Sequence, residues 1–258
     1  QHIGIIPYKN PLFRNLLSFL NKTLGKLILS NANKVIFSNS LTKIYFTEIC
    51  NFKNPPSMIL NGVSNLIFYP NEINRKSIRE EFNLPKDELI FLFVGRFVEK
   101  KGLHIVKELV ARFENITWIL VGEGPVPVKN WNYNNLVLTG NCNREKLNKL
   151  YQVADLLILP SKGEGLPLCV QESMSCGTPC LISSETLESF PEIKNCVFDA
   201  PITDDSATIW SKKINEILSS HKFRELRKEL PTASNNYWGL ESCKKKYMAE
   251  LSILLTNP

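Results

Sequence analysis

The order of apolar runs along the chain constrains its fold more than any other feature of the sequence. Short runs rich in β-forming residues occur at residues 58–60, 89–94, 116–121, 136–139, 156–159 and 180–182. Between them, apolar residues recur at helical spacing, as at Leu147, Leu150, Tyr151 and Ala154. Strands that alternate with helices predict a parallel sheet covered on both faces. We therefore expect an α/β chain with one complete, doubly wound parallel-sheet domain.

The first 52 residues do not follow this pattern. Apolar residues recur at helical spacing over residues 11–32, and a short strand at residues 35–38 and a helix at residues 41–50 follow. One strand and two helices cannot close a core alone, and the adjacent prolines in residues 51–56 indicate a linker. We therefore expect these residues to be the tail of a second domain whose earlier part lies outside this chain.

Composition and charge narrow the kind of partner. No apolar run among the 258 residues approaches the ~20 needed to span a bilayer. The seven cysteines form no C-x-x-C pair and are expected to be reduced thiols in a cytoplasmic protein. The net charge of +6 is spread along the chain without interleaved aromatic residues, which argues against nucleic acid as a partner. An anionic small molecule or an acidic membrane surface fits better.

The predicted helix over residues 11–32 leaves two interpretations open. It combines an apolar face with basic residues, Arg14, Lys22 and Lys26, on other faces. A basic amphipathic helix can hold a protein on an anionic membrane surface. Alternatively, its apolar face packs inside the domain to which it belongs, and this is the interpretation we favour.

The nonapeptide E-G-L-P-L-C-V-Q-E carries the strongest functional signal. It sets two carboxylates, Glu164 and Glu172, eight positions apart across a turn that opens a short helix. Pro167 suits a first helical position and Gly177 suits a left-handed stop, so the helix is predicted over residues 167–176.

The turn before this predicted helix suits an anionic ligand. Gly163 and Gly165 bracket Glu164 and allow unusual backbone dihedral angles. The free N–H groups at a helix N-terminus attract phosphate. We predict that a diphosphate binds there, with Glu164 beside the group that the diphosphate carries. This is the outline of a site for a sugar donor.

Two further motifs fall in loops after predicted strands, where ligands of parallel sheets bind. In G-R-F-V-E-K-K-G, residues 95–102, Arg96 and Lys101 are placed to converge on one anion. Basic pairs are also common on solvated loops, but a second glycine-rich loop at Gly122 on the same edge favours a phosphate-rich ligand. That second loop has Pro127 where a dinucleotide fingerprint has its third glycine, which argues against a nicotinamide enzyme.

Taken in order, these motifs resemble a known family. G-R-x4-K-G, L-V-G-E-G-P, A-D-L-L-I-L-P-S and E-x7-E followed by C-G-T-P resemble the retaining GT-B glycosyltransferases of family 4, the glycosyl transferases group 1. The resemblance implies a GT-B fold with two Rossmann-like domains. Residues 53–235 would form the nucleotide-sugar donor-binding domain, residues 1–52 the C-terminal remnant of the N-terminal, acceptor-side domain, and residues 236–258 a C-terminal crossover helix.

The resemblance also implies residue roles. Arg96 and Lys101 would grip the donor diphosphate, Glu172 would bond the ribose hydroxyls, and Glu164 would contact the transferred sugar. Glu164, Arg96 and Lys101 are thus the expected catalytic residues. The other expected donor-binding positions are Gly95, Gly122, Gly163, Gly165, Leu166, Pro167, Leu168 and His2. His2 matches a family histidine that faces the donor, although a terminal histidine is also consistent with simple exposure to solvent.

The function implied is a cytoplasmic transferase that moves a sugar from a nucleoside diphosphate sugar to a glycan or lipid-linked acceptor with retention, in polysaccharide biosynthesis. Peripheral contact with the anionic inner face of the plasma membrane is compatible with it. No cofactor besides the donor is expected, and without a D-x-D pair no metal site is expected. Two alternatives remain: a sugar-nucleotide epimerase of the same fold, and a nucleotide-sugar-binding fragment without turnover.

Overall fold

One parallel sheet organises most of the chain. The computed structural model describes residues 11–256. Its large sheet has the order β5-β4-β3-β6-β7-β8, and all neighbouring strands are parallel. The strands are β3 (Ile90–Val94), β4 (Thr117–Val121), β5 (Leu136–Gly140), β6 (Leu156–Leu159), β7 (Cys180–Ser183) and β8 (Phe198–Ala200). The order reverses between β3 and β6, and ligands bind at such switch points. The predicted doubly wound α/β fold is confirmed.

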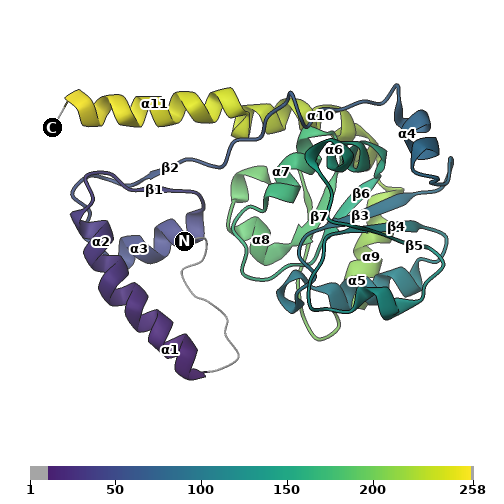
Figure 1. Cartoon of the computed structure of the whole chain (residues 1–258), viewed down its shortest axis with the longest axis horizontal. Coiled ribbons are helices and arrows are strands. Elements are labelled where there is room, and N and C mark those ends of the chain that lie inside the picture. The colour runs from purple at the N-terminus through teal and green to yellow at the C-terminus, as the bar shows by residue number, and fades with distance from the viewer. Residues whose placement is uncertain (1–10, 257–258) are drawn as a thin grey trace.

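Helices cover both faces of this sheet (Figure 1). One face carries α5 (Leu103–Arg112) and α9 (Ser206–Ser219), and the other carries α6 (Arg144–Val153), α7 (Leu168–Ser175) and α10 (His221–Trp238). The shorter elements are α4 (Arg75–Glu81), α8 (Ser184–Glu188) and the 3-10 turns η2 (Glu99–Lys101), η3 (Val128–Trp131) and η4 (Pro191–Ile193). Every residue of β4, β6 and β7 is buried, so apolar burial on both faces stabilises the sheet.

The helix predicted after Glu164 is present as α7. Pro167 is its N-cap, in an extended conformation, and Cys176 is its C-cap. Gly177 follows with a φ of +78°, as expected for a left-handed stop. A Cβ at this position would also lie 2.8 Å from the carbonyl oxygen of Arg227 in α10, so the end of α7 requires glycine for two reasons.

The N-terminal part of the described chain forms a small unit of its own. It contains α1 (Pro11–Leu20), a π-helical turn η1 (Asn21–Gly25), α2 (Lys26–Asn31), β1 (Ile36–Phe37), α3 (Ser40–Ile49) and β2 (Ser57–Met58). Its core is a small cluster of four buried residues, Val35, Phe37, Phe46 and Cys50. The rings of Phe37 and Phe46 stack with centroids 6.2 Å apart. The single long helix expected over residues 11–32 is thus helical from Pro11 to Asn31, but a π turn interrupts it.

The strand expected at residues 58–60 does not join the large sheet, and this part of the prediction was wrong. Ser57 and Met58 instead pair in parallel with Ile36 and Phe37 of β1. The amide of Ser57 donates to the carbonyl oxygen of Val35 at 3.0 Å. The apolar run identified a strand, but nothing in the run specified which strand would supply its hydrogen bonds.

The last helix, α11 (Leu240–Thr256), returns to the N-terminal unit (Figure 1). The ammonium group of Lys34 lies 2.8 Å from Oε2 of Glu250, and the hydroxyl of Ser57 donates to the same carboxylate. Just before α11, at the last residue of α10, the carbonyl of Trp238 accepts a hydrogen bond of 2.9 Å from the amide of Val63. These contacts connect the two ends of the described chain to each other.

No helix within residues 11–256 is long and apolar enough to cross a membrane. Several apolar side chains of α1, η1 and α2 are exposed: Leu12, Phe13, Leu16, Phe19, Leu24, Leu27 and Ile28. An exposed apolar face is compatible with both interpretations of this helix, which stay predictions.

Candidate donor-binding site

Two loops meet at the switch point of the sheet. One follows β3, covering residues 95–102, and the other follows β6, covering residues 160–167. Gly102 has a φ of +70°, and a Cβ there would lie 2.0 Å from the carbonyl oxygen of Pro160. The amide of Lys162 donates to the carbonyl of Lys100 at 2.8 Å. The loops are therefore held together through their backbones.

Side chains from these loops form a compact cluster of charges. The ammonium group of Lys101 lies 3.2 Å from Oε1 of Glu164, and that of Lys100 lies 3.1 Å from the same oxygen. The side chains of Lys101 and Glu164 are only 13% and 16% exposed, so water screens this contact less than an ordinary surface pair. A Cβ on Gly95 would lie 3.5 Å from Cε of Lys101, which places Gly95 beside the lysine.

Arg96 is on the same loop as Lys101 but stands apart from this cluster. Its side chain is exposed and makes no hydrogen bond or ion pair with any residue in the range 11–256. The prediction that Arg96 and Lys101 both lie in the loop after one strand is confirmed, and that strand is β3. Their convergence on one anion remains a prediction.

The N-terminus of α7 lies directly after Glu164 in the chain. The first helical hydrogen bonds are made by Val170 and Gln171, whose amides donate to the carbonyl of Pro167 at 3.0 and 3.3 Å. The amides before Val170 have no hydrogen-bond partner within the helix, as at any helix start. Leu166 is buried and Leu168 is half exposed, so the turn is anchored on one side and open on the other.

The two glycines around Glu164 contact different parts of the structure. Gly163 has a φ of +65°, and its amide donates to Oε1 of Glu185 at 2.9 Å. Gly165 lies against the N-terminal unit, because a Cβ there would be 2.7 Å from Cβ of Asn39. Asn39 is buried and caps α3 by accepting a hydrogen bond from the amide of Thr42. No pattern in the sequence indicated this contact, and Asn39 was not predicted at the site.

Glu172 lies further along α7 and is held by a buried tyrosine. Its Oε2 accepts a hydrogen bond of 2.9 Å from the hydroxyl of Tyr151, which is fully buried. Burial raises the pKa of Glu172 above its usual value, and the Tyr151 hydrogen bond and the charge of Arg144 partly oppose this. Tyr151 appeared in the sequence only as part of a helical period, so its role as a partner was missed.

Gly122 brings a third loop to the same edge. Its φ is +135°, and a Cβ would lie 2.0 Å from the carbonyl oxygen of Gly95. Beside it, a pocket of about 780 Å³ opens at the carboxyl ends of β4 and β5, with Phe97, Gly122, Glu123 and Gly140 among its lining residues. The glycine thus allows the loops after β3 and β4 to touch, next to a volume that suits a small molecule.

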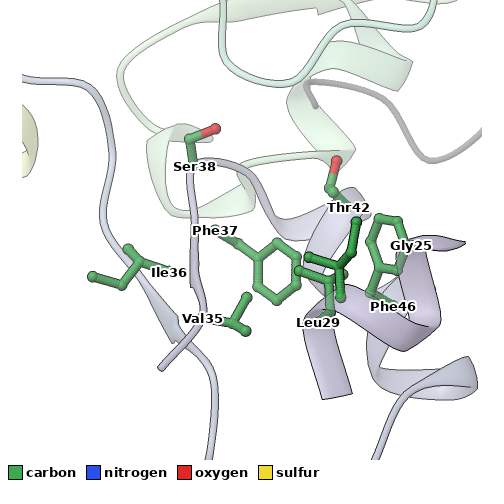
Figure 2. A pocket seen from close by; sticks show the side chains of 9 residues that line it. Gly25, Leu29, Val35, Ile36, Phe37, Ser38, Thr42 and Phe46 are labelled. Carbon is green, nitrogen blue, oxygen red and sulfur yellow. The ribbon is translucent and has the colours of Figure 1, made fainter. Parts of the chain in front are cut away.

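A different pocket lies in the N-terminal unit, between α2, β1 and α3 (Figure 2). It has a volume of about 300 Å³ and no charged residue among those that line it. Figure 2 shows Phe37 and Phe46 among the side chains that line it, with Ser38 and Thr42 at one end. Because a diphosphate needs cations or amides, this pocket does not fit the predicted ligand.

The structure therefore brings Gly95, Lys101, Glu164 and Gly122 to one edge of the sheet, with Glu172 farther along α7. His2 lies outside the described residues.

More than half of the chain matches a known family. The family model for glycosyl transferases group 1 matches residues 74–234, more than half of the 258 residues. The chain belongs to this family. The match covers the large sheet and the three loops described above.

Curated relatives agree with this assignment. An uncharacterized glycosyltransferase of Methanocaldococcus jannaschii is 28% identical over 204 residues, which are 72% of this chain and 52% of that protein. The UDP-Gal:alpha-D-GlcNAc-diphosphoundecaprenol alpha-1,3-galactosyltransferase of Escherichia coli is 29% identical over 144 residues, which are 50% of this chain and 36% of that protein. The chain spans about half, or less, of the length of these relatives.

Solved structures show the same fold. Sucrose-phosphate synthase from Thermosynechococcus elongatus superposes with a TM-score of 0.82 at 23% identity. The superposition covers 98% of this chain and 65% of the synthase chain. HepE of Anabaena, solved in complex with UDP-glucose, gives a TM-score of 0.75 at 15% identity. The superposition covers 97% of this chain and 71% of the HepE chain. The GT-B type of fold implied by the sequence motifs is thus confirmed.

Proposed function

We propose that this chain binds the donor of a retaining glycosyltransferase, which moves a sugar from a nucleoside diphosphate sugar to a glycan or lipid-linked acceptor. One observation carries the proposal: Lys101 lies 3.2 Å from Glu164 at the switch point of the sheet, just before the N-terminus of α7. A cation beside a carboxylate suits a ligand in which a diphosphate adjoins a sugar.

The diphosphate is assigned to Lys101, Arg96 and the free amides at the start of α7. When the bond between the sugar and the diphosphate breaks, negative charge develops on the departing phosphate. Fixed cations and helix amides stabilise that charge, and the loss of one such donor typically costs about 3 kcal/mol of transition-state stabilisation. No metal ion or other cofactor has a step in this proposal.

The two glutamates are assigned to the two sugars of the donor. Glu164 contacts the transferred sugar, where a carboxylate orients hydroxyl groups and stabilises positive character on the anomeric carbon. Glu172 accepts hydrogen bonds from the ribose hydroxyls. Its Oε2 already accepts from Tyr151, and the other carboxylate oxygen, Oε1, is assigned to the ligand hydroxyls.

The remaining donor contacts follow the loops of the site. Backbone and side-chain contacts are assigned to Gly95, Gly122, Gly163, Gly165, Leu166, Pro167, Leu168 and His2. In the transfer step, the acceptor hydroxyl oxygen bonds to the anomeric carbon, the bond to the phosphate oxygen breaks, and the acceptor proton passes to the departing diphosphate. Attack on the same face of the sugar retains the anomeric configuration, so Glu164 is not assigned as a covalent nucleophile.

The comparisons support this choice of substrates. The name of the Escherichia coli relative gives UDP-galactose as donor and a diphosphoundecaprenol-linked sugar as acceptor, and HepE was solved with UDP-glucose. We assign residues 1–52 to an acceptor-side domain and residues 53–235 to the donor-binding domain, in a cytoplasmic protein that works at the inner face of the plasma membrane. The family match favours this transferase over the epimerase alternative.

Product analysis tests the proposed reaction. A preparation of the whole protein is incubated with a panel of nucleoside diphosphate sugars and with glycan and lipid-linked acceptors. The proposal expects an acceptor product with the anomeric configuration of the donor. An inverted product would contradict the retaining mechanism, and a changed sugar still attached to the nucleotide would identify an epimerase instead.

A further inference from the structure

A second lysine contacts the carboxylate of Glu164, and it lies outside the motif positions that carry the family resemblance. The ammonium group of Lys100 lies 3.1 Å from Oε1 of Glu164, about as close as that of Lys101 at 3.2 Å. The Lys100 side chain is 33% exposed and that of Lys101 is 13% exposed. One carboxylate oxygen therefore contacts two ammonium groups, of which that of Lys100 is the more exposed.

The backbone of Lys100 also connects the two loops of the site. Its carbonyl oxygen accepts a hydrogen bond of 2.8 Å from the amide of Lys162. On the other side, the amide of Gly163 donates to Glu185. The two residues before Glu164, Lys162 and Gly163, are thus each held by a backbone hydrogen bond. Lys100 accepts the first of these bonds, so its side chain is anchored beside Glu164.

Donor binding changes the balance of charge in this cluster. A diphosphate that engages Lys101 competes with Glu164 for the same ammonium group. If Lys101 were the only cation near Glu164, the carboxylate would be left facing a new negative charge, and like charges at short range repel. Lys100 removes this difficulty because it can keep Glu164 neutralised while Lys101 serves the phosphate.

We infer that Lys100 is a positioning residue, which holds Glu164 at the transferred sugar when Lys101 engages the diphosphate. This inference rests on the proposed function. It assigns the two lysines different roles. Lys101 contacts the diphosphate directly, whereas Lys100 affects the sugar through Glu164. The two roles predict different effects on ligands with and without a sugar.

Calorimetry with paired ligands tests this role. The purified chain is titrated with UDP and UDP-glucose, and in parallel with GDP and GDP-mannose and with ADP and ADP-glucose. For the pair that binds, Lys100→Gln should leave the affinity for the nucleoside diphosphate within about twofold of the unsubstituted chain. The same variant should weaken the nucleotide sugar about fivefold, the size expected for a partly buried ion pair. Lys100→Arg should restore most of that loss.

A double-mutant cycle shows whether Lys100 acts through Glu164. In a Glu164→Gln background, the Lys100→Gln substitution should no longer affect the affinity for the nucleotide sugar, because the carboxylate that Lys100 holds is gone. Lys107→Gln, an exposed lysine on α5, is the matched control and should change neither affinity. Thermal unfolding of each variant checks that the fold is intact.

The outcomes separate the inference from the function on which it rests. If the unsubstituted chain binds none of these ligands, the proposed function fails. If it binds a pair but Lys100→Gln weakens both members equally, or neither, the positioning role is wrong and donor binding stands. An undiminished effect of Lys100→Gln in the Glu164→Gln background, or no rescue by Lys100→Arg, would also overturn it.

Discussion

Gly102 lies against Pro160 so closely that a Cβ on the glycine would be 2.0 Å from the proline carbonyl oxygen. Gly102 follows Lys101, and Pro160 follows β6, four residues before Glu164. Because this is a backbone contact, no side chain can rotate to make room. The contact therefore sets the distance between the loop that carries the proposed phosphate cation and the loop that carries the proposed sugar carboxylate.

Gly102→Ala should destabilise the chain and open the site. The substitution adds a steric clash with backbone to a left-handed φ of +70°, and together these should lower the free energy of unfolding by about 3 kcal/mol. Urea denaturation measures the loss.

Gly163→Ala is the matched control for this prediction. Gly163 has a similar φ of +65°, but a Cβ there would meet nothing within 4 Å. Only the left-handed conformation is penalised, so the loss should be about 1 kcal/mol. Equal losses for the two variants would mean that contact with Pro160 does not constrain the loops.

Glu172 should make stability fall as the pH rises. Burial raises its pKa in the folded chain above the usual 4.5. Above pH 4.5, the folded state keeps a proton that the unfolded chain has lost, so the stabilisation present at low pH is lost as the pH rises through the raised pKa. Glu172→Gln removes this loss, and the variant should gain stability relative to the unsubstituted chain between pH 4.5 and neutral pH.

Urea unfolding at several pH values measures that difference. Glu188→Gln, at an exposed glutamate on α8, controls for the loss of a surface carboxylate. A stability difference between Glu172→Gln and the unsubstituted chain that stays constant with pH would contradict the assigned environment of Glu172.

Cys169 should resist thiol reagents in the folded chain. It lies in the first turn of α7, and burial raises the pKa of its thiol to about 12. The thiolate is the reactive form, so almost none is present at pH 8. Mass spectrometry after brief iodoacetamide treatment should show Cys169 unmodified in the native chain and modified in urea. Rapid native modification would mean that the start of α7 is open to reagents.

The features predicted well are those set by local sequence. Helical spacing and the pair Pro167 and Gly177 define α7 within the chain segment itself, and apolar runs identify the buried strands. The partner of β2 was not predictable in this way. Ser57 and Met58 look like any short strand, and their pairing with β1 depends on contacts made by other parts of the chain.

The same distinction applies to the site. The motifs placed Lys101 and Glu164 in loops at one sheet edge, and topology brought them together as expected. Tyr151 and Asn39 were missed because each reaches the site from a segment far from its partner in sequence. Lys100 was missed because it lies outside the motif positions that identified Lys101. The residues next to such a tyrosine or lysine in the sequence do not indicate which distant group its side chain will contact.

Lys101 and Arg96 are proposed to hold a diphosphate before the N-terminus of α7. Isothermal titration of the chain with UDP, GDP and ADP tests this proposal most directly, with Lys101→Ala and Arg96→Ala as variants and Lys107→Ala on α5 as the control. We expect at least one nucleotide to bind, and each of the first two variants to weaken that binding by about tenfold or more, which is about 1.4 kcal/mol. Lys107→Ala should have no effect. Binding that is unchanged in Lys101→Ala and Arg96→Ala, or no binding of any of the three nucleotides, would contradict the account.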